Sequence, residues 1–182
     1  MARAKPKKVT EATGGEQPGD PRPAGTKPVD DRIFLVVVDE SEEMGVALRF
    51  ACRRAIATGG RVALFYVVEP ADFGHWMAVE DLMEKERRMV AEETLTKYSD
   101  IVTGLTGELP VLLIREGNRR DALLKLLEEE PGISILVLAS GVGKGGPGPL
   151  IQALTGKFYK HLRVPVTIVP GNLSDDEVDA LT

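Results

Sequence analysis

Short apolar runs rich in β-branched residues recur along the middle of the chain. They cover residues 33–38, 62–68, 111–114, 133–138 and 166–169. A continuous apolar run bounded by polar turns is typical of a strand that is buried on both faces. The pattern therefore predicts five strands.

Between these runs, apolar residues recur at a spacing of three to four, which is typical of helices. Helices are predicted over 42–58 and 79–105, after the N-cap residue Asn118, and from about Pro149. The core stripe expected for the second helix is Leu82, Met83, Val90, Tyr98, Ile101 and Val102. The face expected for the last helix is Leu150, Leu154, Phe158 and Leu162.

Strands and helices alternate throughout this region. Such alternation favours parallel strands joined by right-handed helical crossovers. The predicted fold class is α/β, a doubly wound three-layer sandwich with a five-stranded parallel sheet, Rossmann-like.

Residues 1–31 differ in composition from the rest of the chain. They contain five prolines and four glycines but no Leu, Ile or aromatic residue. Such a segment cannot bury enough apolar area to offset the entropy of ordering it, so we predict a disordered tail. Its basic start leaves open a solvated tail, a weak electrostatic contact with a membrane or nucleic acid, or a targeting leader. The acidic residues Glu11, Glu16 and Asp20 disfavour the leader.

Residues 171–182 are expected to form an acidic C-terminal tail, because they carry no strand pattern. Ser174, followed three residues later by Glu177, fits the capping box of a short helix. We expect an exposed end without a more specific role.

Residues 32–170 are predicted to form one domain. The chain has 182 residues, of which 43% are apolar, so a sizeable core is possible.

The net charge of −5 lacks the excess of basic residues that is typical of a nucleic-acid-binding protein, so no nucleic-acid partner is expected. A single cysteine, Cys52, and the lack of any apolar run near the ~20 residues of a membrane span favour a cytoplasmic protein without a membrane partner.

A glycine-rich loop follows the fourth predicted strand. Five of the eight residues from Gly141 to Gly148 are glycine, and glycine lets backbone N–H groups approach a phosphate closely. Ligands of open parallel sheets bind beyond the carboxyl ends of the strands, where the first strand runs into Asp39. Phosphate binding and a plain flexible connector both remain open from this loop alone.

The pair Gly143-Lys144 looks like part of a Walker A loop. That motif requires a glycine where this chain has Leu138, and a Ser or Thr where it has Gly145. The hydroxyl that would hold Mg²⁺ is therefore missing, and a P-loop nucleotidase is not expected.

The chain resembles the universal stress protein family over about residues 32–170, and three stretches carry the resemblance. They are R-I-F-L-V-V-V-D-E-S-E-E at 32–43, L-L-I-R-E-G-N-R-R-D-A-L at 112–123, and the segment 135–169 with its glycine loop and final P-V-T-I-V. The resemblance implies an adenine nucleotide α-hydrolase-like fold. In the family's nucleotide-binding members it also implies a Gly-x2-Gly-x9-Gly-(Ser/Thr) motif.

Gly143, Gly146 and Gly156 fit the spacing of that motif, and Gly141 is an alternative first glycine. Lys157 stands where the motif has Ser or Thr. The lysine could substitute for the hydroxyl as a point charge on the phosphates, or it could fill the space.

The resemblance also implies roles for two residues at the strand ends, Asp39 and Val67. Asp39 would lie at the adenine and ribose, with an N-cap on the first helix as the alternative. Val67 would line the adenine pocket, with plain core packing as the alternative. Ala139, at the end of the fourth strand, completes the expected cofactor-binding residues.

Catalytic and metal-binding patterns are not evident. His75, beside Trp76, would be part of a lid, a partner contact or simple packing, and His161 is expected at the surface. Cys52 reads as a small buried hydrophobe. No His or Cys cluster has metal-ligand spacing, and no catalytic triad suggests itself.

Two functions remain open. The first is a stress-associated regulatory module that binds ATP or ADP, with or without Mg²⁺, and hydrolyses it slowly at most. The second is a nucleotide-free dimeric interaction protein of the same fold. The family resemblance implies a homodimer through the last strand, from Val166 to Val169, because unpaired edge groups favour pairing with another chain.

Overall fold

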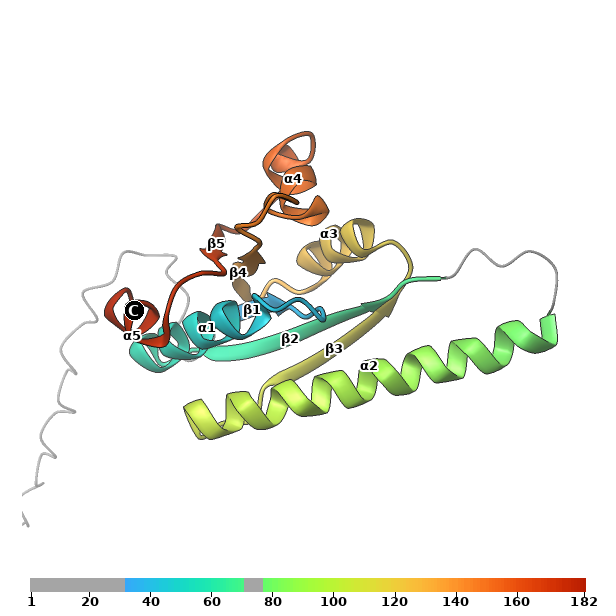
Figure 1. The fold of residues 1–182 in the computed structure, drawn as a ribbon, viewed down its shortest axis with the longest axis horizontal. Helices are drawn as coiled ribbons and strands as arrows, with labels where there is room; N and C mark the ends of the chain where they lie inside the picture. Colours follow the sequence, from blue (N-terminus) through green and yellow to red (C-terminus); the bar gives the residue numbers. More distant parts are fainter. Residues whose placement is uncertain (1–31, 71–76) are drawn as a thin grey trace, which may run out of the picture.

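The computed structural model describes residues 32–70 and 77–182, which form one sheet with helices packed around it (Figure 1). The strands are β1 (Ile33–Val37), β2 (Arg61–Val68), β3 (Val111–Glu116), β4 (Ile133–Ser140) and β5 (Val166–Pro170). The helices are α1 (Met44–Thr58), α2 (Met77–Thr106), α3 (Arg119–Glu129), α4 (Pro149–Thr155) and α5 (Asp175–Ala180), with a 3-10 turn at Tyr159–His161. The tail 1–31 and the residues His75 and Trp76 lie outside the described residues.

The five strands are all parallel and lie in the order β3-β2-β1-β4-β5. The predicted fold class is therefore confirmed. The chain builds the sheet outward from β1 in one direction and then returns to add β4 and β5 on its other side. The strand order reverses between β1 and β4, so their carboxyl ends border the place where a doubly wound sheet opens a crevice.

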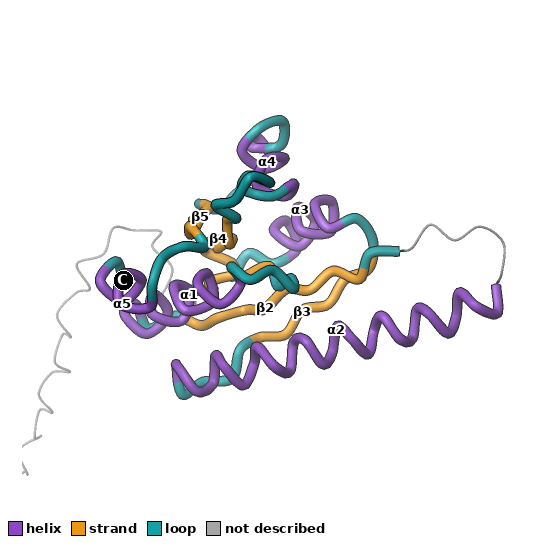
Figure 2. Tube along the Cα trace, viewed as in Figure 1, coloured by secondary structure: helices purple, strands orange, loops and turns teal. Residues whose placement is uncertain are grey.

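Alternation along β1 divides the core into two layers. Phe34 and Val36 pack on the side of α1 and α2, whereas Leu35 and Val37 pack on the side of α3 and α4. Successive side chains of a strand point to opposite faces, so a continuous apolar run supplies both layers. Figure 2 shows β2 and β3 lying between α2 on one side and α3 and α4 on the other.

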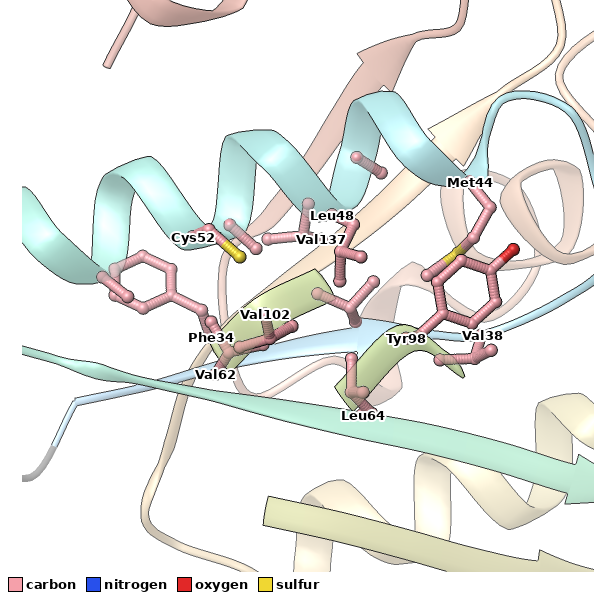
Figure 3. Packing of buried hydrophobic residues seen from close by; sticks show 14 of the residues in the cluster. Phe34, Val38, Met44, Leu48, Cys52, Val62, Leu64, Tyr98, Val102 and Val137 are labelled. Atoms are coloured by element: carbon pink, nitrogen blue, oxygen red, sulfur yellow. The ribbon is translucent and has the colours of Figure 1, made fainter. Parts of the chain in front are cut away.

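Helix α1 supplies much of the first layer (Figure 3). Met44, Leu48 and Cys52 recur every fourth residue and are at most 1% exposed. They point toward the strands, and the Tyr98 ring of α2 lies beside Met44. Burial of each large apolar side chain stabilises the fold by about 1.5–3 kcal/mol. The interpretation of Cys52 as a buried hydrophobe is confirmed.

Two residues that were predicted to end or begin helices do so in the structure. Asn118 caps α3, and its Oδ1 accepts a hydrogen bond from the Asp121 N–H at 3.3 Å. Gly59 ends α1 with φ 64°, a conformation that favours glycine. The helix α1 begins at Met44, two residues later than expected, with Glu43 at the N-cap.

The buried stripe of α2 differs from the prediction. Ala91, Leu95, Tyr98 and Val102 are buried at a spacing of four, three and four residues. Val90 and Ile101, which were expected in the core, are 43% and 41% exposed because each lies one position away from that stripe. The apolar pattern alone did not fix the rotation of this helix against the sheet.

The prediction of one continuous last helix is wrong. Helix α4 ends at Thr155, and Gly156 leaves the helical conformation at φ −95°, ψ −109°. A β-carbon at Gly156 would lie 2.8 Å from the Gln152 carbonyl oxygen, so this exit requires glycine. Phe158 and Leu162 still pack against the core beside α3 and α4, but from the turns that follow α4. His161 accordingly lies exposed in the 3-10 turn.

The C-terminal segment is mostly exposed, but one helix in it packs on the domain. Ser174 and Glu177 form the predicted capping box, with the Ser174 N–H donating to Glu177 Oε2 at 2.8 Å. The resulting helix α5 folds back onto α1, where Val178 is completely buried and Asp179 is bound by Arg49. The contact was not foreseen because a single buried residue in a six-residue helix leaves no periodic signal.

Candidate functional site

A cavity of about 280 Å³ opens at the carboxyl edge of the sheet. Val37 and Leu138 line it from the ends of β1 and β4. Residues 147–151 and Ala153 form one wall, at the start of α4. Glu69 and residues 118–120, which follow β2 and β3, form the opposite wall. The cavity thus occupies the point where the strand order reverses, as the general rule for open α/β sheets predicts.

Asp39, the second residue after β1, lines this cavity. Its Oδ1 accepts a hydrogen bond from the Ser41 N–H at 3.0 Å, which fixes the turn and the orientation of the carboxylate. Its backbone oxygen accepts from the Tyr98 hydroxyl at 3.5 Å. Burial and the charges of Asp39 and Glu40 raise the pKa of Tyr98, so this hydroxyl keeps its proton. The alternative role of Asp39 as N-cap does not hold, because Glu43 occupies that position.

The glycine-rich segment folds into a compact turn next to the cavity. The Gly146 N–H donates to the Gly143 carbonyl at 3.1 Å, and Gly146 adopts φ 71°. A β-carbon at Gly141 would lie 3.0 Å from the Gly146 carbonyl oxygen, so the segment closes on itself. Gly148 at φ 91° then turns the chain into α4. Only the part from Pro147 onward reaches the cavity wall.

The structure brings some of the predicted site residues together and separates others. Asp39 and Ala139 line the cavity. Gly141, Gly143 and Gly146 form the turn that precedes its wall.

The other predicted residues lie outside the cavity lining. Val67 is 3% exposed and packs in the core beside α3 and α4, as its alternative interpretation expected. Gly156 lies at the C-terminal end of α4, and the following Lys157 is exposed. The Lys157 Nζ lies 5.7 Å from the centre of the Phe158 ring, so this lysine does not fill the crevice.

The wall formed by Glu69, Asn118, Arg119 and Arg120 was not among the predicted site residues. The Arg119 N–H donates to Glu69 Oε1 at 3.3 Å, and Arg119 Nη2 lies 3.5 Å from Glu69 Oε2. The sequence contains a signal that could have identified this wall, because its residues follow the predicted strands β2 and β3. All strands of a parallel sheet end at the same edge, so polar residues after any of them become neighbours of Asp39.

Neither a metal centre nor a membrane span appears in the part of the chain that the structure describes. Within residues 32–70 and 77–182, no group of three or more His, Cys, Asp or Glu side chains could hold a metal ion. No helix in those ranges is long and apolar enough to cross a bilayer.

Sheet order and cavity position together define the class: a doubly wound α/β protein with a ligand cavity at the topological switch point. Comparison with known families then identifies it more closely. The chain belongs to the universal stress protein family, whose family model matches residues 32–170. No curated protein matches the chain.

Solved structures of universal stress proteins share the fold. Universal stress protein UspA from Lactobacillus plantarum is 16% identical, with a TM-score of 0.64 over 77% of this chain and 98% of that chain. The universal stress protein from Archaeoglobus fulgidus is 21% identical, with a TM-score of 0.54 over 75% and 91%. A universal stress protein in complex with cAMP is 19% identical, with a TM-score of 0.55 over 76% and 96%.

Proposed function

We propose that the protein is a stress-associated regulatory module of the cytoplasm that binds ATP or ADP in the cavity between β1 and β4. The observation that carries this proposal is the cavity itself. Its volume of about 280 Å³ is close to the lower end of the ~300–1,000 Å³ range of small-molecule pockets. Its polar side chains come from the segments that follow β1, β2 and β3 and from the start of α3. A relative of the same fold was crystallised in complex with cAMP, which also favours an adenine nucleotide.

The residues around the cavity fit the parts of a nucleotide. Asp39 presents a carboxylate whose Oδ1 is held by the Ser41 N–H, which leaves Oδ2 for a hydroxyl or amino donor of the ligand. Val37, Leu138 and Ala139 offer apolar surface for a base. The turn formed by Gly141, Gly143 and Gly146 leads the chain to the cavity wall. Because these residues are glycines, they place no side chain between the turn and a ligand. Lys157 is not among the residues that line the cavity, and its Nζ lies 5.7 Å from the centre of the Phe158 ring.

Hydrolysis is not part of the proposed role. Among the described residues, the cavity lining contains no histidine, cysteine or serine, and Asp39 and Glu69 are its acidic groups. We therefore expect ATP to be bound and turned over slowly at most. Ligand binding would order the glycine turn and change the surface that a partner meets.

The first experiment is direct. The purified protein is denatured, and the supernatant is analysed for released adenine nucleotide; ATP and ADP are then titrated by calorimetry. Release of nucleotide, or a saturable heat at submillimolar ATP, supports the proposal. No released nucleotide together with no heat at millimolar ATP overturns it.

Asp39→Asn is the informative variant, because the amide keeps an oxygen for the Ser41 N–H, removes the charge and puts an NH2 donor where Oδ2 could accept. Loss of a hydrogen bond to a charged group is worth ~1.5 kcal/mol or more, so we expect an affinity loss of about tenfold. Glu40→Gln is the matched control, since Glu40 is the exposed neighbouring acid. Equal losses in both variants would indicate a general charge effect and not a contact.

We further propose that the module acts as a homodimer through β5, the edge strand next to β4. Edge strands carry unpaired N–H and C=O groups that favour pairing with a second chain. Ile168 of β5 is 37% exposed, which supplies apolar surface along this edge.

A further inference from the structure

The cavity wall opposite α4 carries two arginines, Arg119 and Arg120. They are the only lysine or arginine residues that line the cavity in the described part of the chain. Two carboxylates, Asp39 and Glu69, also line it. The positive charge of the cavity is therefore concentrated at the start of α3, away from the glycine turn.

Arg119 is held in place but incompletely paired. Glu69 engages its backbone N–H and its Nη2, as described above. Its Nε is buried and has no hydrogen-bond partner among the described residues. A buried N–H without an acceptor destabilises the fold, so an anionic oxygen that reached it would relieve this cost.

Arg120 is oriented by two contacts. Its Nε donates to Asp121 Oδ1 at 2.7 Å, its Nη2 lies 2.7 Å from the same oxygen, and its guanidinium carbon lies 4.3 Å from the centre of the Phe158 ring, so a phosphate would compete with Asp121 for this arginine. Phe158 belongs to the turn after α4, so this stacking joins the two walls of the cavity. A planar guanidinium fixed in this way loses little further freedom when it binds a phosphate.

We propose that Arg119 and Arg120 bind the phosphates of the nucleotide, in place of the hydroxyl that the glycine motif lacks at Lys157. This inference rests on the proposed function and assigns the phosphate end of the same site. Arginine forms paired, charge-assisted hydrogen bonds with phosphate oxygens, which are stronger than bonds between neutral groups. The phosphates would lie between the two arginines and the wall that begins at Pro147, and they would compete with Glu69 for Arg119.

If this assignment is correct, the affinity for a nucleotide increases with its phosphates, and the two arginines of α3 are responsible for the increase. Adenosine, AMP, ADP and ATP are titrated by calorimetry into the parent protein and into Arg119→Gln and Arg120→Gln. We expect each variant to lose about tenfold or more in affinity for ADP and ATP, equivalent to ~1.4 kcal/mol or more, because a charge-assisted bond is removed. Adenosine affinity should change by less than about twofold, since base and ribose contacts remain.

Matched controls remove a positive charge elsewhere. Lys157→Gln tests the position that the motif assigns to the phosphates, and Lys125→Gln tests an exposed lysine on α3 outside the cavity. Neither should change ATP affinity by more than about twofold. Circular dichroism and thermal melting verify that each variant is folded, and Arg120→Lys retains the charge if Arg120→Gln proves unstable.

The outcomes separate this inference from the proposed function. If the parent binds ATP but both arginine variants bind it equally well, or if Lys157→Gln alone loses affinity, the assignment of the arginines is wrong and nucleotide binding stands. If the parent binds neither adenosine nor ATP, the proposed function is wrong. Pyrophosphate titrated by phosphorus NMR then decides the remaining point. If pyrophosphate broadens its signal with the parent but with neither arginine variant, the two arginines bind an anion. If pyrophosphate is not broadened by the parent, the anion site is wrong as well.

Discussion

Arg49 of α1 and Asp179 of α5 form two parallel hydrogen bonds, from Nε to Oδ1 at 2.8 Å and from Nη2 to Oδ2 at 2.7 Å. Arg53, one turn further along α1, binds the same two oxygens at 2.8 and 2.6 Å. Two guanidinium groups therefore share one carboxylate, and the side chain next to it in sequence, Val178, is buried. The C-terminal segment is attached to the domain through this cluster.

The cluster predicts a pH-dependent contribution to stability. Hydrogen bonds from Arg49 and Arg53 lower the pKa of Asp179 from 3.8 to about 2. A carboxyl group whose pKa is lowered by folding stabilises the fold above its unfolded pKa, and this stabilisation is lost as the pH falls through the folded value. Asp179→Asn should therefore melt at a lower temperature than the parent at neutral pH.

The difference between parent and Asp179→Asn should shrink between about pH 4 and pH 2 and vanish below that range. Thermal melting followed by circular dichroism across this range measures it. Asp100→Asn is the control, because Asp100 is an exposed acid on α2. A difference that persists unchanged at the acid end would mean that the charge of Asp179 is not what binds the two arginines.

A second prediction concerns the reactivity of Cys52. Burial raises the pKa of its thiol to about 11, and the residue is 0% exposed. The thiolate is the reactive form, so the native protein should not react with a disulfide reagent at mildly alkaline pH. Reaction should follow unfolding in guanidinium chloride. Ala57→Cys in a Cys52→Ala background is the control, since Ala57 is exposed on the same helix and its cysteine should react at once.

The glycines of the motif should differ in their effect on stability. A β-carbon at Gly156 would lie 2.8 Å from the Gln152 carbonyl oxygen, whereas one at Gly143 would meet no atom within 4 Å. Gly156→Ala should lower the free energy of unfolding by about 1–3 kcal/mol through overpacking. Gly143→Ala should change it by less than ~0.5 kcal/mol. Urea denaturation of both variants measures the contrast, and equal effects would contradict it.

The proposed dimer can be tested at Ile168. A lysine there places a charge on the edge of β5, which disfavours pairing with another strand. Sedimentation should show the parent as a dimer at micromolar concentration and Ile168→Lys as a monomer. Leu112→Lys is the control, because Leu112 is 47% exposed on β3, the opposite edge of the sheet. A parent that sediments as a monomer would remove the basis for this part of the proposal.

Much of the fold could be predicted because its signals are local. The run I-F-L-V-V serves two core layers at once, which is typical of a strand covered on both faces. Asn118 and Gly59 mark helix ends through contacts within a few residues. The position of Asp39 at the crevice followed from its place after β1 and from a general rule on parallel sheets.

The candidate site was predicted less completely, because its walls are assembled from distant segments. Glu69 and Arg119 are fifty residues apart in the chain and are joined by a hydrogen bond. The apolar spacing of Leu154 and Phe158 suggested one helix, but a close approach of Gly156 to the Gln152 carbonyl ended it. Such close approaches depend on atoms that a linear pattern does not represent.

The sequence by itself determined the five strands and the helices between them, except for the end of the last helix, and it indicated that the strands are parallel, because propensity, capping and alternation act over short distances. Only the tertiary structure decided that Arg119 and Arg120 face α4 across the cavity, that Lys157 lies outside it, and that α5 closes onto α1. Those outcomes depend on how the helices are rotated and packed against the sheet, and packing is a property of the whole core and not of any one segment.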